Sequence, residues 1–190
     1  MLMVDECHLL WGDARGYVWG PRGKRIVIPI DNIRERQTYY GALNLLTGQA
    51  VVWEAATGNM EYTVGFLTYL RQVFQGRRLL ICWDRAPYHR GHVVQEYLEQ
   101  INGPASPEPA RKIQIELFAP HAPVQNPIED VWLRGKRAVR QQWFDLQTFQ
   151  DVKTVFTHTI THGQFHSKKL TWYGQDELIL QRRNLGYKWE

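Results

Sequence analysis

The sequence predicts an α/β domain in which a mixed five-stranded sheet is flanked by helices. Short apolar or alternating runs recur along the chain, as expected for strands. Amphipathic helical segments separate the later strands, which favours parallel pairing with helical crossovers. Two β-prone runs in QTYYGALNLLTGQAVVWEA (37–55) meet at Thr47-Gly48, which indicates an antiparallel hairpin. The sheet should therefore mix antiparallel strands early in the chain with parallel strands later.

The elements are expected in the order strand, hairpin, helix, strand, helix, strand, helix. LMVDE forms the first strand and ends in a carboxylate pair. After the hairpin, apolar residues at three- and four-residue steps predict a helix from Asn59, with Gly76 as its C-cap. RRLLICWD (77–84) is a continuous apolar run that ends at Asp84, and we expect it to be the buried central strand.

The second half continues this pattern. A helix around 93–101 precedes a Pro-rich loop at 103–110, and IQIELF alternates as a strand does. One helix should begin after Asn126 and a last one should cover 151–162 and stop at Gly163. The boundaries expected are a core at 1–145 and a C-terminal helix and tail at 146–190.

Composition limits the class of protein. At 190 residues, with 44% hydrophobic and 22% charged residues, the chain fits a single globular domain. No apolar run approaches the ~18 residues that span a bilayer, and the N-terminus lacks a signal peptide pattern, so we expect a cytoplasmic protein without a membrane partner. The two cysteines are far apart and should be reduced thiols. The net charge of +4 leans toward a polyanionic partner.

The segment NPIEDVW (126–132) has two interpretations. Asn126 suits an N-cap and Pro127 the first helical position. Glu129, three residues after the cap, could close a capping box. Alternatively, its carboxylate binds a metal ion. The choice depends on which other acidic side chains converge on this helix end.

Two more carboxylates stand at strand ends. Asp5 ends the first strand and Asp84 ends the most apolar one, and functional residues gather at such edges of α/β sheets. A turn or cap role would also explain Asp84. Carboxylates that converge repel one another unless protonated or bridged by metal, and Mg²⁺ suits oxygen ligands. A pair of such ions can cleave a phosphodiester.

Three segments in this order resemble the blocks of DDE transposases, closest to the insertion-sequence 630 and mariner-like superfamily of bacteria: VDECHLLW, ICWDRAPYHR and FAPHAPVQNPIEDVW. The resemblance implies a ribonuclease H-like fold. It implies that Asp5, Asp84 and Glu129 are the catalytic residues and ligate two Mg²⁺ ions, for which Mn²⁺ could substitute. It also implies DNA as partner, a homodimer on DNA and a nucleoid location.

Other residues near these blocks are further candidates. Glu6 should point away from Asp5 and is a second choice of ligand. His89 could contact DNA, position a ligand or be structural. Arg85 stands where the family has Asn; it could bind a phosphate or weaken the binding of metal. Lys136 and Arg140 return to the helix face of Glu129 and could meet DNA phosphates, although a charged face is more often only solvated.

Two groups of ring side chains have competing interpretations. If exposed, Trp11, Trp19 and Trp143 could stack on unpaired bases, although core packing is the commoner role. His158, His162 and His166 are spaced by four, which suggests zinc, but Gly163 interrupts the helix and ordinary surface histidines are preferred.

Three functional hypotheses follow. The first is a transposase catalytic domain that cleaves DNA and joins the freed 3′ hydroxyl to a target. The second is a nuclease of the same fold that cuts without joining. The third is a decayed domain that binds DNA without chemistry. The family usually carries a helix-turn-helix region before the catalytic domain, and we expect it to be absent here because Met1 lies close to the first strand.

Overall fold

The structure is a computed structural model that describes residues 1–14, 20–25, 27, 34–104, 112–120, 123–166 and 168–184. Trp19 and most of the predicted Pro-rich loop lie outside these residues.

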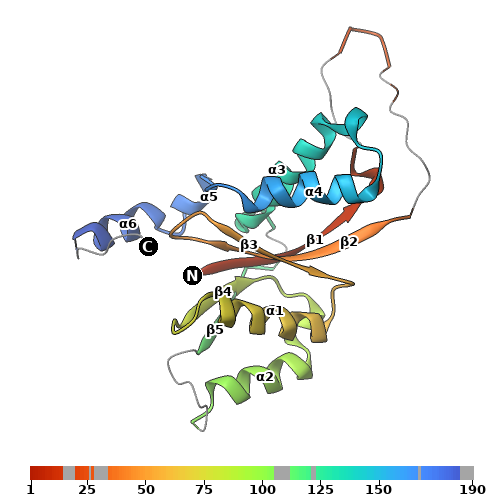
Figure 1. Cartoon of the computed structure of the whole chain (residues 1–190). Helices are drawn as coiled ribbons and strands as arrows, with labels where there is room; N and C mark the ends of the chain where they lie inside the picture. Colours follow the sequence, from red (N-terminus) through yellow and green to blue (C-terminus); the bar gives the residue numbers. More distant parts are fainter. Residues whose placement is uncertain are drawn as a thin grey trace.

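A five-stranded sheet in the order β3-β2-β1-β4-β5 forms the middle of the molecule (Figure 1). β1 (Leu2–Leu10), β2 (Arg36–Asn44) and β3 (Ala50–Ala55) pair antiparallel. β4 (Leu79–Trp83) pairs parallel with both β1 and β5 (Ile113–Leu117). The predicted mixed sheet is confirmed. The predicted central strand is wrong, because β1 and not β4 occupies the middle position.

Helices cover both faces of this sheet (Figure 1). α1 (Met60–Val73) and α2 (His92–Asn102) lie on one face. α3 (Ile128–Gln141) and α4 (Phe149–Thr161) lie on the other and pack against each other. Short α5 (Lys168–Thr171) and α6 (Gln175–Asn184) follow. Single 3₁₀ turns are η1 (Trp11–Ala14), η2 (Pro87–Arg90), η4 (Pro123–Gln125) and η5 (Trp143–Asp145). This is the three-layer ribonuclease H-like arrangement.

β1 contributes to both hydrophobic cores because its side chains alternate across the sheet. Leu2 and Val4 are buried with α1 and α2, whereas Met3, Cys7 and Leu9 are buried with α3 and α4. The middle strand thus carries its two acidic residues, at 5 and 6, to opposite faces of a sheet that is covered on both sides.

Several predicted element ends need correction. α1 is capped by Asn59, whose side chain accepts from Tyr62 N–H, but it ends at Val73, and Gly76 adopts its left-handed conformation (φ 69°) only in the following turn. α4 begins earlier than predicted because Thr148 and Asp151 form a capping box. Its end before Gly163 (φ 98°) is as predicted.

The C-terminal segment is fixed to the rest of the fold. Phe165 and Leu170 are buried in the core beneath α3 and α4. Phe165 N–H donates to Gly48 O (2.7 Å), and Gln175 Nε2 donates to Leu45 O (2.7 Å). The segment therefore continues the α3–α4 layer across the tip of the β2–β3 hairpin. None of the described helices has the length and apolar character needed to cross a bilayer.

Candidate active site

Asp5 and Asp84 lie at the same level of neighbouring strands. Asp84 follows the end of β4 as predicted, but the prediction that Asp5 ends the first strand is wrong, because β1 continues to Leu10 along β2. β1 and β4 pair in parallel with Leu2 opposite Ile81 and Met3 opposite Cys82. Two further steps of this register bring Asp84 level with Asp5. Parallel pairing of two strands distant in sequence therefore unites the first and second predicted carboxylates at one end of the β1–β4 pair.

The third predicted carboxylate comes from the first turn of α3, which is attached to β1. Buried Asn126 donates from Nδ2 to Val4 O (3.0 Å), and its Oδ1 accepts from Ile128 N–H (3.3 Å). Asn126 thus serves the start of α3 as predicted, although the residue directly before the helix is Pro127, which the sequence placed inside it. The negative charge of Glu129, one residue into α3, acts on Asp5.

The electrostatics of Asp5 show how closely the acidic groups gather. Burial raises the pKa of Asp5 from 3.8 to about 8, and the negative charges of Glu129, Glu6 and Asp84 add to the increase. Trp132 Nε1 donates to Asp5 Oδ2 (3.3 Å). A partly buried carboxyl that is surrounded by other acids is a site at which a cation would relieve repulsion.

Asp84 is held by its own turn and by a histidine. Its Oδ1 accepts from Ala86 N–H (2.9 Å) and lies 2.9 Å from His89 Nδ1, an ion-pair distance although without hydrogen-bond geometry. Among the described residues, no three acidic, His or Cys side chains stand close enough for a ready-made metal centre. Both of these contacts of Asp84 are made by Oδ1, and its side chain is 57% exposed.

His89 joins Asp84 to Glu6. Its ring is buried and stacks on Trp83 with centroids 4.4 Å apart, and Nε2 lies 2.8 Å from Glu6 Oε1. Burial lowers the pKa of His89, but the two carboxylates outweigh it and raise the pKa to about 9. Tyr88 OH also donates to Glu6 Oε2 (3.2 Å). Glu6 lies on the face opposite Asp5, as predicted from strand alternation.

The burial of His89 bears on its predicted roles. With 1% of its surface exposed and both ring nitrogens facing carboxylates, it has no edge free for DNA. The contacts fit both of the other roles considered for His89, positioning a ligand and supporting the fold.

The predicted basic residues lie along β1 and the end of β5. Lys136 Nζ donates to His8 O (3.1 Å) and pairs with Asp13 (3.2 Å). Arg140 Nε donates to Asp13 O (3.1 Å). Both residues follow Glu129 along the face of α3 that meets β1. Each already makes a contact within the protein, Lys136 with Asp13 and His8 and Arg140 with Asp13. Arg85 is exposed, and its Nε donates to Phe118 O (3.3 Å).

The structure places the predicted tryptophans that it describes and the predicted histidines in different environments, the first buried and the second exposed. Trp11 and Trp143 are buried and pack edge to face, with centroids 5.3 Å apart, which confirms core packing, the commoner role, over stacking on bases. His158 and His162 stack on the surface of α4 with centroids 4.1 Å apart. His166 is also exposed. Among the residues that the structure describes, no group of His, Cys or acidic side chains could hold a zinc ion.

Sequence reasoning missed the role of Gly41. In the β1–β2 register it stands opposite Asp5. A Cβ there would overlap Cη2 of Trp132 and stand 2.6 Å from its Cζ2 and 3.0 Å from Ile128 Cδ1. The missing side chain lets Trp132 lie over β2 and donate to Asp5. A glycine inside a strand pattern is the available signal, since it often marks a close approach.

Gly41→Ala is expected to destabilise the fold by about 1–3 kcal/mol, the usual cost of overpacking a core. The displaced Trp132 indole should also lose its hydrogen bond to Asp5. Thermal unfolding measures the first effect. Trp132→Leu in the Gly41→Ala background should recover part of the stability, and Gly12→Ala, where a Cβ meets nothing within 4 Å, is the control. A Gly41→Ala protein as stable as wild type would contradict the packing described here.

Asp5→Asn is expected to stabilise the metal-free protein, and more at pH 8 than at pH 5. The folded pKa of Asp5 is raised to about 8 from 3.8, so its ionisation lowers wild-type stability as the pH rises between these values. Asn keeps an acceptor for Trp132 without the charge. In melts with EDTA, the Tm advantage of the variant should grow by on the order of 5 °C across this range. Asp176→Asn, at an exposed position, is the control, and its Tm difference from wild type should not change with pH. The same constant Tm difference for Asp5→Asn would show that Asp5 is not under electrostatic stress.

Comparison with known proteins identifies the family of this chain. The family model of the DDE superfamily endonucleases matches residues 1–155, and the chain belongs to this family. No curated protein sequence is similar enough to match the chain.

Solved structures share the fold at low sequence identity. The Mos1 transposase paired-end complex with left transposon end aligns with a TM-score of 0.60 and 14% identity, over 95% of this chain and 52% of that one. The Mos1 strand transfer complex gives 0.55 and 14%, over 100% and 55%. The simian T-cell lymphotropic virus intasome gives 0.57 and 12%, over 88% and 50%. The chain therefore spans about half the length of these proteins.

Proposed function

We propose that this chain is the catalytic domain of a DNA transposase, which cleaves one DNA strand and joins the freed 3′ hydroxyl to target DNA. The observation that supports the proposal is the environment of Asp5, whose pKa is raised to about 8 by burial and by the negative charges of neighbours that include Glu129 and Asp84. Family membership and a fold shared with Mos1 transposase support it.

The donor set fits magnesium. Asp5, Asp84 and Glu129 offer only carboxylate oxygens, which Mg²⁺ prefers, and the repulsion at Asp5 would be relieved by a cation. Two bound ions would activate water and stabilise the leaving oxygen. The chain itself orients the carboxylates: Trp132 holds Asp5, the turn at Ala86 and His89 hold Asp84, and Asn126 fixes the start of α3.

Further features of the proposal follow from the same relatives. The mariner Mos1 paired-end complex is known with Mg and, separately, with Mn, which supports either metal for this chain. DNA ends and a target would be the partners, and a homodimer on DNA is the proposed assembly. Arg85, Lys136 and Arg140 are the proposed phosphate contacts. The corresponding location is the bacterial cytoplasm, at the nucleoid.

A plasmid assay tests the proposal. The protein is incubated at low salt with supercoiled plasmid and a labelled oligonucleotide carrying a free 3′ hydroxyl. With Mg²⁺ or Mn²⁺ we expect nicked plasmid and plasmid joined to the label, and with EDTA neither product. Nicking without joining at any oligonucleotide concentration would make the chain a nuclease. Absence of both products with either metal would contradict the proposal.

A further inference from the structure

A groove between α3 and α5 carries a concentration of positive charge close to Glu129. This groove, here called the α3–α5 groove, has a volume of about 540 Å³. Arg134 lines it from α3, and Lys168, Lys169 and Trp172 line it from the C-terminal segment. Asp130 is its one acidic lining residue and pairs with Lys169 (2.7 Å). Cations thus outnumber carboxylates in a hollow that is lined by residues on either side of Glu129 in the sequence.

The groove is held in shape by the fold. Leu170 is fully buried beneath it, and the Arg134 guanidinium lies 4.9 Å from the centre of the Phe165 ring. Tyr173 OH donates to Gln125 O (2.6 Å), just before α3 begins. The cationic side chains are therefore carried by backbone that is anchored at both ends of α5.

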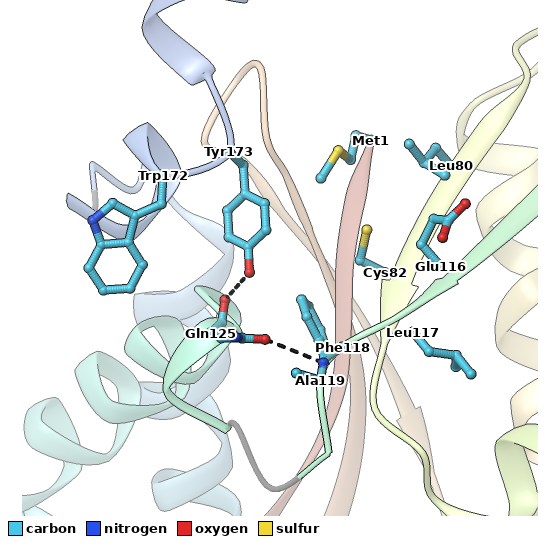
Figure 2. Close-up of a pocket in the computed structure, with 10 residues that line it drawn as sticks. All are labelled: Met1, Leu80, Cys82, Glu116, Leu117, Phe118, Ala119, Gln125, Trp172 and Tyr173. Atoms are coloured by element: carbon cyan, nitrogen blue, oxygen red, sulfur yellow. Dashed lines mark hydrogen bonds between the residues drawn. The ribbon is translucent and has the colours of Figure 1, made fainter.

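Trp172 separates this groove from a second hollow. Its side chain is 62% exposed although it is large and apolar. It also lines a cavity of about 480 Å³ over β4 and β5, whose floor includes Leu80, Cys82 and Phe118. Figure 2 shows Tyr173 directed at Gln125 while Trp172 stands to one side, away from the sheet. An exposed ring between a cationic groove and an apolar hollow has the character of a stacking platform for unpaired bases.

We propose that the α3–α5 groove binds an unpaired DNA strand, with phosphates at Arg134 and Lys168 and a base stacked on Trp172. Arg134 lies five residues after Glu129, about 7.5 Å along the axis of α3 and about 140° around it, so the strand would run along a different face of α3 from the one that carries Glu129. This rests on the proposed function for the identity of the strand. The family match ends at residue 155, so the α5 side of the groove lies beyond it.

The test is the affinity of the whole chain for a labelled single-stranded oligonucleotide, measured by fluorescence anisotropy with EDTA at several salt concentrations. Trp172→Ala should weaken binding about fivefold to a hundredfold at every salt concentration, because a stacked base is lost. Lys168→Ala should reduce the slope of log affinity against log salt by about 0.7, the share of one phosphate on a single strand. Both side chains are exposed, so both variants should melt as wild type does.

Matched controls share the chemistry but lie elsewhere. Phe144→Ala removes another exposed ring (71%), and Arg77→Ala removes an exposed cation before β4; neither should change the affinity. If Trp172→Ala and Lys168→Ala bind the oligonucleotide as wild type does, the proposal that the groove binds DNA is overturned. The proposed function would still stand if the wild-type protein nicks plasmid. The same measurement with polyglutamate, a polyanion without bases, tests the selectivity of the groove. If both variants lose affinity for polyglutamate as much as for the oligonucleotide, the proposed binding of a DNA strand is overturned. Binding that depends on Trp172 without any nicking would support the groove and contradict the proposed function.

Discussion

Asp84→Asn is expected to reduce metal-dependent nicking at least about a thousandfold. A bound metal ion contributes several kcal/mol to a phosphodiester transition state, and a loss of about 4 kcal/mol corresponds to this factor. Asn retains an oxygen for Ala86 N–H, so the turn after β4 should survive. The variant loses the charge that a metal requires and the ion pair with His89. Initial rates of plasmid relaxation with saturating Mn²⁺ measure the effect.

Glu61→Gln serves as the control for Asp84→Asn. Glu61 is an exposed acid in the first turn of α1, on the far face of the sheet, and its loss should leave the rate within about twofold, as expected of a surface substitution. Equal nicking by Asp84→Asn and wild type would remove Asp84 from the site, or reveal a contaminating nuclease. A loss in both variants would indicate damage to the fold and not to the chemistry.

The elements of the fold could be predicted because their signals are local. The hairpin at Gly48, the helix from Asn59 and the helix after Asn126 each have a periodicity or a cap that depends only on neighbouring residues. The central strand was misassigned because strand order is set by pairing between distant segments. β4 is as apolar as a central strand, yet the hairpin adds both of its strands beyond β1 and so moves β1 to the middle.

The candidate site likewise has parts with a local signal in the sequence and parts that depend on contacts between distant segments. The end of an apolar run and a helix start singled out Asp84 and Glu129, and the resemblance joined Asp5 to them. His89, close to Asp84 in sequence, could be named as a positioning residue, but the groups that contact the site from distant segments could not be predicted. Gly41 matters only because Trp132, from a helix far along the chain, lies over it. Glu6 reaches Asp84 only through His89, a path that crosses from one sheet face toward the other.

His89→Gln is expected to lower nicking about 10- to 100-fold, the usual effect of removing a group that orients a metal ligand. Gln cannot bridge Asp84 and Glu6 at once, and it does not stack on Trp83 as the imidazole does. Asp84 would then lose its fixed orientation. The metal concentration for half-maximal rate should therefore rise together with the fall in rate, which a purely structural role would not produce.

Tyr88→Phe is the matched control, because it removes the other hydrogen bond to Glu6 without touching Asp84. Its rate and metal dependence should stay within about threefold of wild type, because Asp84 keeps its contacts with Ala86 and His89 and the lost bond to the Glu6 carboxylate, about 1.5–3 kcal/mol, bears on stability instead. Glu6→Gln should fall between the two variants, because the His89 ring keeps an acceptor but loses a charge. If His89→Gln keeps the wild-type metal dependence while its Tm falls, the histidine supports the fold only, and the orientation of Asp84 rests on the Ala86 turn.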